Sequence, residues 1–290
     1  MILNIFFLST ITGYSQEKTV TIKKTIGFGK EVYHVRNKKD NIKQGPYSYK
    51  YFNNVHIEGQ YLNDSKQGNW QYFIGDNFKI NGFYDKGGKD SLWTYSENNK
   101  LKAEIHYKNG RRNGTATGYE EGKIHSILPY KNGKIDGVKK VFYENGSTKF
   151  EVGFKNDTVD GDLKYYDIEG KMILHLIYKN NRPFSLEKME MPDSIKYFSG
   201  KLKNGTGSIR IFSKNMHTDS IFLVSEQEYS NGFLNGKCTE YGENGKLKFT
   251  GNYKHNCMIG QWNFYNPNDP KAHAIKAYSL KDSIRKILRT

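Results

Sequence analysis

The sequence predicts an all-β fold, an elongated array of antiparallel β-hairpins, and three observations lead to this prediction. From Tyr61 to Tyr178, an aromatic residue followed seven positions later by glycine or serine recurs every 23 or 24 residues, the length of one unit in a repeat protein. Apolar residues alternate with polar ones on both sides of each pair, as in strands with one buried face. Segments rich in Asn and Gly, which favour turns, separate these strands. About ten such units would account for most of the chain.

The recurring aromatic residue and glycine are called the anchor pair below. The anchor glycine is expected where a β-carbon would clash or where φ is positive. Serine replaces it in two weaker pairs, Tyr84 with Ser91 and Tyr178 with Ser185, which indicates a softer requirement there. The clear pairs are Tyr61 with Gly68, Tyr107 with Gly114, Tyr130 with Gly137, Phe154 with Gly161, Tyr229 with Gly236 and Tyr253 with Gly260.

Each unit is expected to contain two strands, one on either side of the anchor pair. Before the aromatic residue, positions minus four and minus two alternate with polar positions, as in Phe150 and Val152 or Leu174 and Leu176. After the glycine, apolar residues occupy alternate positions, which predicts that they face the core. These are Trp70 and Tyr72, Trp93 and Tyr95, Leu163 and Tyr165, Ile209 and Ile211, and Trp262 and Phe264.

Two kinds of polar segment join the strands. Glu144-Asn145-Gly146, Glu169-Gly170 and Glu243-Asn244-Gly245 are predicted as the tight hairpin turns, because Asn and Gly accept positive φ. Segments of the Lys-Asn-Gly type lead through polar residues to the next anchor glycine. These are Lys108-Asn109-Gly110, Lys131-Asn132-Gly133, Lys155-Asn156-Asp157 and Ser230-Asn231-Gly232.

The pattern Gly-x-Tyr-x6-Gly-x-Trp-x-x-aromatic resembles the MORN repeat. It runs from Gly59 to Phe73 and again from Gly251 to Tyr265. With Tyr143-Glu144-Asn145-Gly146, it is most similar to the bacterial variant of YwqK-family proteins, over roughly residues 31 to 266. The resemblance implies a MORN-like meander. Because YwqK-like proteins are labelled antitoxins, it also implies a toxin as a partner to consider.

The chain is divided as follows. Residues 1–15 are predicted to be a signal peptide, with an apolar Ile2–Leu8 and small residues before Gln16, although the absence of Lys or Arg leaves a buried N-terminal strand as an alternative. Residues 16–44 form an N-terminal strand or cap region. Residues 45–266 form the hairpin repeats, degenerate at 183–227. Residues 267–290 form a C-terminal capping tail, in which 271–290 could be a helix or a closing strand.

The formal charge of +15 could attract an anionic partner, but lysines on turns and exposed strand faces would also keep a long sheet soluble. An aromatic content of 14% argues against a disordered chain. Nucleic acid is not favoured as a partner, because the sequence contains no recognition helix, zinc module or basic tract. A membrane or glycan surface remains an alternative partner. A protein partner is preferred, and it would be acidic if the positive charge of the chain contributes to binding.

No catalytic, cofactor-binding or metal-ligating residue is predicted, and no enzyme activity or cofactor is expected. The eight histidines recur at no fixed phase of the repeat, and no Cys or His spacing is typical of zinc. Cys238 takes the core position two residues after the anchor glycine, whereas Cys257 is expected in the following loop. A disulfide between them is an alternative in an oxidising compartment.

The sequence therefore favours a non-catalytic MORN-like protein-interaction scaffold, exported to the periplasm or the cell surface of a bacterium. Two alternatives remain. One is a YwqK-like antitoxin or immunity protein, which would be cytoplasmic if the signal peptide is absent. The other is a protein that binds anionic lipid or glycan surfaces.

Overall fold

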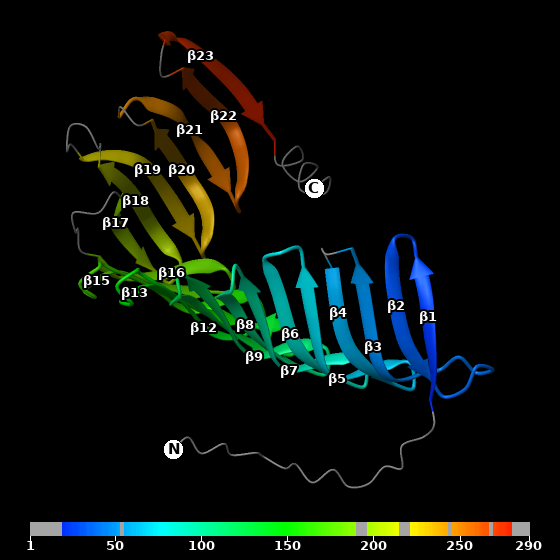
Figure 1. Ribbon diagram of the computed structural model, residues 1–290. Helices are drawn as coiled ribbons and strands as arrows, with labels where there is room; N and C mark the ends of the chain where they lie inside the picture. Colours follow the sequence, from blue (N-terminus) through cyan, green and yellow to red (C-terminus); the bar gives the residue numbers. More distant parts are fainter. Residues whose placement is uncertain are drawn as a thin grey trace. The chain divides into compact units, whose positions relative to one another are not determined.

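The computed structural model describes residues 19–52, 55–189, 196–214, 221–242, 245–266 and 269–279. The predicted signal peptide, residues 1–15, lies outside the described residues. Within these ranges all regular secondary structure is β-strand, and consecutive strands pair antiparallel, so the predicted all-β meander of hairpins is confirmed (Figure 1).

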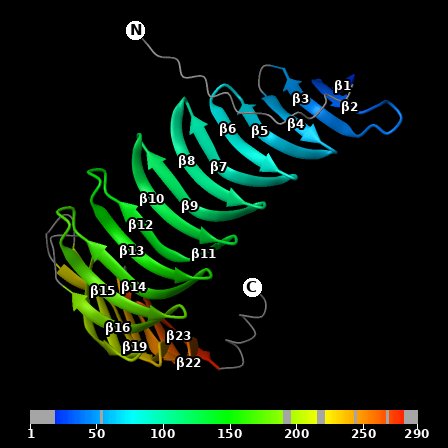
Figure 2. The same ribbon diagram turned by 90° about the horizontal axis from the view of Figure 1, so that it is seen from below.

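The described residues divide into two compact units, one up to Arg111 and the other from Arg112 onward. In the first unit the strands pair in chain order, each antiparallel to the next. They are β1 (Val20–Ile26), β2 (Gly29–Val35), β3 (Lys43–Tyr51), β4 (Val55–Leu62), β5 (Ser65–Ile74), β6 (Phe78–Asp85), β7 (Gly88–Glu97) and β8 (Lys100–Lys108), coloured blue to cyan in Figure 2.

The second unit contains two ladders of strands. The first ladder comprises β9 (Arg111–Glu120), β10 (Lys123–Lys131), β11 (Lys134–Ile135), β12 (Gly137–Phe142), β13 (Thr148–Lys155), β14 (Thr158–Tyr166), β15 (Met172–Lys179) and β16 (Arg182–Met189). The second comprises β17 (Lys196–Lys203), β18 (Thr206–Lys214), β19 (Ile221–Ser230), β20 (Phe233–Tyr241), β21 (Leu247–Lys254), β22 (Cys257–Asn266) and β23 (Asp269–Tyr278). The join between the ladders falls in residues 183–227, where the sequence predicts degenerate repeats.

The tightest hairpin turns are not where the sequence predicts them. Two-residue turns with positive φ at both positions, the signature of type I′, occupy the Lys-Asn-Gly-type segments, and two more, Asn98-Asn99 and Glu121-Gly122, lie at the alternate junctions. At Glu144-Asn145-Gly146 the loop is wider: the Tyr143 N–H donates to the Ser147 carbonyl at 2.9 Å, and only Gly146 has positive φ. The tight turns include Asn63-Asp64, Lys86-Gly87, Asn109-Gly110, Asn132-Gly133, Asn156-Asp157, Asn180-Asn181, Asn204-Gly205, Asn231-Gly232 and His255-Asn256.

The anchor glycine lies in a β-bulge. In the β4–β5 pair, Glu58 is opposite Gln71 and Gln60 is opposite Gln67, so the single residue Gly59 faces three residues that begin with Gly68. The bulge requires positive φ, which is 71° at Gly68 and 111° at Gly161. Ser91 has a φ of 57°, which lies in the left-handed region open to residues other than glycine, and Ser185 is not among the positive-φ residues, in agreement with the softer requirement predicted for these two copies.

The bulge lets a tryptophan ring lie directly on the backbone of the opposite strand. A β-carbon on Gly59 would stand 2.2 Å from Cδ2 of Trp70, and one on Gly82 would stand 2.1 Å from Cδ2 of Trp93. Both rings are 1% exposed, and the Trp70 Nε1–H donates to the Gln60 carbonyl at 3.2 Å. Gly251 and Trp262 repeat the arrangement, which confirms the predicted core face.

Hydrogen bonds at the tight turns link each hairpin to the one before it. The Gly87 N–H donates to the Lys66 carbonyl at 2.9 Å, and the Asp157 N–H donates to the Ile135 carbonyl at 2.8 Å. In addition, the Asp157 carboxylate accepts from the Ile135 N–H at 2.6 Å. The contacts recur from unit to unit, and we call them the turn ladder. It gives a structural reason for the polar residues that fill these segments.

The second unit has a core made by both of its ladders. Leu174, Leu176, Leu202 and Ile209 are buried together, with Tyr178 and other half-buried side chains around them. Leu202 takes the anchor position two residues before a tight turn, but Gly207 follows it after five positions instead of seven. The β17–β18 register is uninterrupted, so the two missing residues are those of the bulge.

At the C-terminal end, β23 is antiparallel to β22, so 269–278 form a strand rather than a helix, while 280–290 lie outside the described residues. Cys257 is not in a loop, as predicted, but is the first residue of β22, directly after the turn. Cys238 is buried at 3% exposure, and the two cysteines are free thiols.

Candidate functional site

One face of the first unit carries a continuous row of aromatic rings, the aromatic stripe, because residues two apart on a strand share a face. Some neighbouring rings meet edge to face, with centroids 5.2 Å apart for Tyr61 and Trp70 and 5.1 Å apart for Tyr84 and Trp93, and others, such as Trp70 and Tyr72, are stacked. Such pairs add to the stability gained by burial. The stripe consists of Tyr33, Tyr47, Tyr61, Trp70, Tyr72, Tyr84, Trp93, Tyr95 and Tyr107.

Three lysines, Lys43, Lys66 and Lys89, lie on the aromatic stripe and are called the lysine stripe. Lys66 in β5 and Lys89 in β7 stand two positions before the anchor residues Gly68 and Ser91, and Lys43 in β3 stands two positions before Gly45, which lies 23 residues ahead of Gly68. The Lys66 ammonium is 4.3 Å from the Trp70 ring centroid, and that of Lys89 is 3.9 Å from the Trp93 centroid. Each ammonium has three rings within cation–π distance, so its position is fixed by the fold.

The lysine stripe has little negative charge to balance it. Glu31, which is 8% exposed, pairs with Lys43 at 3.2 Å. Among the described residues no carboxylate pairs with Lys66 or Lys89, whose side chains donate to the phenol oxygens of Tyr72 and Tyr95 at 2.9 and 3.3 Å. Burial, and then repulsion by Lys89 and Lys43, lowers the pKa of Lys66. The surface is therefore suited to an anionic partner.

The lysine stripe is confined to part of the repeat series. The position two before the anchor glycine holds Arg112 in the next copy and then apolar residues, Ile135, Val159, Leu234 and Met258. No site residue is predicted from the sequence, and the lysine stripe is missed, because each lysine taken singly is typical of a solvated turn. The signal that could have identified it is the recurrence of lysine at one repeat phase in three successive copies.

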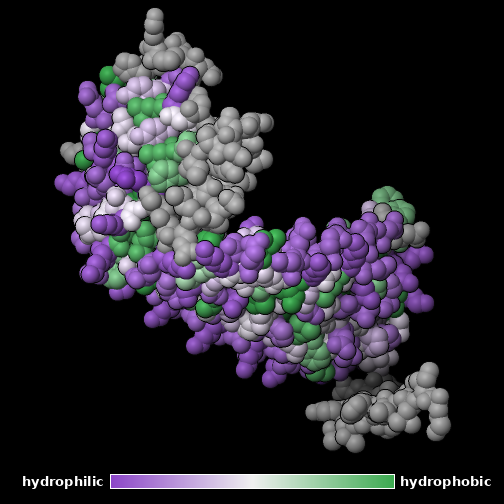
Figure 3. All heavy atoms as spheres, turned by 90° about the vertical axis from the view of Figure 1, so that its left-hand side faces the viewer, coloured by the Kyte–Doolittle hydropathy of each residue, from purple (hydrophilic) through white to green (hydrophobic). Residues whose placement is uncertain are grey.

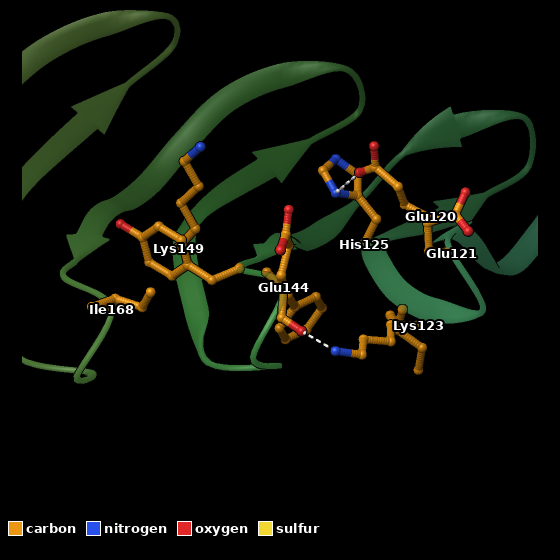
Figure 4. Close-up of a pocket in the computed structure, with 10 residues that line it drawn as sticks. Glu120, Glu121, Lys123, His125, Glu144, Lys149 and Ile168 are labelled. Atoms are coloured by element: carbon orange, nitrogen blue, oxygen red, sulfur yellow. Dashed lines mark hydrogen bonds and ion pairs between the residues drawn. The ribbon is translucent and has the colours of Figure 1, made fainter.

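The second unit has a pocket at the edge of the sheet that carries the Glu121-Gly122 and Glu144-Asn145-Gly146 turns, here called the edge pocket. It has a volume of about 500 Å³ and is lined by residues of β9, β10, β12 and β13 and the loops beside them. In Figure 4, His125 turns toward Glu120, with Nδ1 and Oε2 3.2 Å apart, and the Lys123 ammonium donates to the Glu144 carbonyl at 2.9 Å. The Lys149 ammonium lies 5.5 Å from the Tyr143 ring centroid.

The edge pocket mixes charges of both signs and is open to water. The His125 and Glu120 side chains are 49% and 71% exposed, so their pair contributes little to stability. Burial raises the pKa of Tyr143, whose hydroxyl donates to the Tyr166 carbonyl at 2.9 Å.

The remaining histidines, cysteines and carboxylates are considered only within the part of the chain that the structure describes. There, no three His, Cys, Asp or Glu side chains come together to hold a metal ion, and no helix is long and apolar enough to cross a membrane. His175 Nε2 lies 2.8 Å from Asp162 Oδ1, and this hydrogen bond, with Lys164, lowers the pKa of Asp162.

Comparison with known families identifies the repeat. Residues 94–109, 135–156 and 234–255 match the family model described as MORN repeat variant. No curated protein matches the chain. The resemblance to the MORN repeat is thereby confirmed, and the finer likeness to YwqK-family proteins stays a prediction.

Proposed function

We propose that this MORN-repeat protein is a non-catalytic scaffold of the bacterial cell envelope that binds an acidic protein partner. The observation that carries the proposal is the lysine stripe, a row of three fixed ammonium groups with one carboxylate among its contacts. Charge complementarity of this kind steers association and selects the partner.

The rest of the surface is compatible with such a role. The face shown in Figure 3 is mainly hydrophilic, with hydrophobic residues in small separate groups. The recurring residues, such as the anchor glycines, the tryptophans and the turn asparagines, serve packing and the turn ladder. Binding would therefore use the positions that vary between units, and the lysine stripe is one of them.

A photo-crosslinking experiment in the native host tests this function. A photoreactive phenylalanine analogue replaces Tyr95, on the face of the lysine stripe, or Thr94, which points to the opposite face. We expect one protein to be cross-linked from position 95 and not from 94. Cross-linking only to lipid or glycan from position 95, or to no macromolecule at all, would contradict the proposal.

Fractionation with mass spectrometry of the N-terminus tests the location. A mature protein that starts at Gln16 in the envelope fraction supports export. An intact Met1 in the cytosol would favour the second candidate, a YwqK-like antitoxin that neutralises an acidic toxin through the same basic face. The third candidate, an anionic lipid or glycan surface, requires an affinity for vesicles that falls steeply with salt.

A further inference from the structure

The lysine stripe has a regular spacing that restricts what can bind along it. Its members come from β3, β5 and β7, which are every second strand of the meander. Neighbouring strands lie about 4.8 Å apart, so the row repeats about every 9.6 Å. A ligand that engages all three ammonium groups must present its negative charges at nearly the same interval.

The ammonium groups are held in place before any ligand arrives. Lys66 is surrounded by the rings of Trp70, Tyr72 and Tyr84, at 4.3, 5.3 and 5.1 Å from their centroids. Lys89 is surrounded in the same way, and the phenol of Tyr95 accepts from it at 3.3 Å. A ligand would therefore lose little affinity to the ordering of these side chains.

Among regular peptide conformations, polyproline II matches the interval best. It has three residues per turn and a rise of about 3.1 Å, so every third residue lies on one side and recurs every 9.3 Å or so. Residues on one face of a β-strand recur about every 6.7 Å. An α-helix repeats a face over seven residues, or about 10.5 Å. The difference between this interval and the spacing of the lysines adds up along the row.

We propose that the lysine stripe binds a polyproline II segment of a partner protein that carries a carboxylate at every third residue. This inference rests on the proposed function and specifies the partner's recognition element. The half-buried tyrosines between the lysines suit such a segment, because proline-rich chains dock on aromatic surfaces. The carboxylates would provide the negative charge that the stripe lacks beyond Glu31.

The first test uses a synthetic peptide of repeated Glu-Pro-Pro triplets with blocked ends. Its control has the same composition with all glutamates grouped at one end, so that charge, length and polyproline II content are matched. We expect the triplet peptide to bind the full chain at least about tenfold more tightly than the grouped peptide, a difference of about 1.4 kcal/mol. Equal affinities would overturn the proposal.

The second test assigns the binding to the stripe. Lys66→Gln together with Lys89→Gln should weaken binding of the triplet peptide at least about tenfold. The matched control, Lys50→Gln with Lys108→Gln, removes the same charge from two exposed lysines of the same unit and should change the affinity less than about twofold. Lys43 is left intact because its loss would leave the buried Glu31 carboxylate without its positively charged partner.

A charge-conserving variant guards against loss of folding. Lys66→Arg with Lys89→Arg keeps both charges over the same rings and should retain binding within about threefold. Tryptophan fluorescence of each variant reports whether Trp70 and Trp93 stay buried. Retained peptide affinity in a folded glutamine variant would overturn the proposal, and so would stripe-dependent binding to phosphatidylglycerol vesicles without binding of the triplet peptide.

The two proposals fail in different ways. If the photo-cross-linked partner of the native host binds the glutamine variant as tightly as the wild type, the polyproline II inference is wrong and the scaffold function stands. If binding of the triplet peptide depends on the lysine stripe but no partner protein is cross-linked from position 95, the scaffold function is wrong. The inference that the lysine stripe recognises regularly spaced carboxylates is then retained.

Discussion

At the scale of single residues, a tryptophan ring lying on a glycine is the most demanding contact of the repeat. All three tryptophans of the chain face a glycine in this way: Trp70 with Gly59, Trp93 with Gly82, and Trp262 with Gly251. Where the opposite residue is larger, as at Val152, the tryptophan position holds a leucine, Leu163. The residue at the glycine position and the residue at the tryptophan position therefore depend on each other.

A double-mutant cycle tests this coupling. Gly59→Ala places a methyl group inside the Trp70 ring and should cost about 1 to 3 kcal/mol of unfolding free energy. In the background of Trp70→Leu, which imitates Leu163, the same change should cost at least about 1 kcal/mol less. Denaturant unfolding of the four proteins measures the difference, and strictly additive effects would contradict the pairing.

Cys238 is the buried thiol of the chain, and burial raises its pKa to about 11. A raised pKa means that the folded state favours the neutral thiol. The resulting stability is present below about pH 9, the ordinary pKa of the thiol, and is lost as the pH rises through 11.

We expect iodoacetamide at pH 8 to leave Cys238 unmodified in the native protein and to alkylate it rapidly in denaturant, because only the thiolate reacts. Mass spectrometry of digested samples measures the alkylation of Cys238 in the native and in the denatured protein, with the half-buried Cys257 as an internal comparison. Alkylation of native Cys238 at the rate of a free peptide thiol would show that the site is not closed.

At the scale of the structural element, the turn ladder decides the composition of the tight turns. Asn-Gly is the sequence that a type I′ turn prefers. Several turns nevertheless hold Asp or Asn at the second position, where the side chain accepts from a backbone N–H of the previous hairpin. Examples are Asp64 with Lys43 and Asn181 with Val159, both at 2.7 Å.

Asp157 provides the test. Asp157→Gly creates the preferred Asn-Gly turn but removes the acceptor of the Ile135 N–H, and it should destabilise the protein by about 1 kcal/mol. Asp157→Asn keeps an acceptor and should be nearly neutral. Thermal unfolding of both variants decides the matter: a glycine variant as stable as the wild type would mean that the local turn preference outweighs the ladder.

The sequence predicts the elements well and their junctions less well. The alternation that places Trp70 and Trp262 in the core is local, so it can be read directly. Whether a polar turn is tight depends on which residues oppose each other across the hairpin. Both Glu144-Asn145-Gly146 and Lys108-Asn109-Gly110 satisfy the composition rule, and only the register of the paired strands distinguishes them.

At the scale of the whole molecule, the net charge of +15 sets the response to salt. Repulsion among like charges destabilises a compact state, and screening relieves it. Raising sodium chloride from about 0.1 to about 1 M shortens the Debye length from about 10 to about 3 Å. We therefore expect the unfolding temperature to rise with salt, measured by circular dichroism.

The variant Lys66→Gln with Lys89→Gln carries less of this repulsion and should show a smaller rise with salt than the wild type. An unfolding temperature that falls with salt would mean that ion pairs such as Lys43 with Glu31 dominate instead. In the sequence the lysine stripe is visible only as lysine recurring at one repeat phase in three successive copies, and its charge acquires meaning only because three separate strands place it on one face.

The turn ladder also bears on how such a chain can change in length. Its bonds join residues at nearly constant separations along the sequence, as between Gly87 and Lys66, Gly110 and Lys89, or Gly133 and Arg112. Duplication or loss of one complete unit would leave every remaining bond with an equivalent partner. An insertion of two or three residues would shift a turn away from its acceptor. Gene duplication in whole units is therefore the path along which an array of this kind can evolve without unfolding.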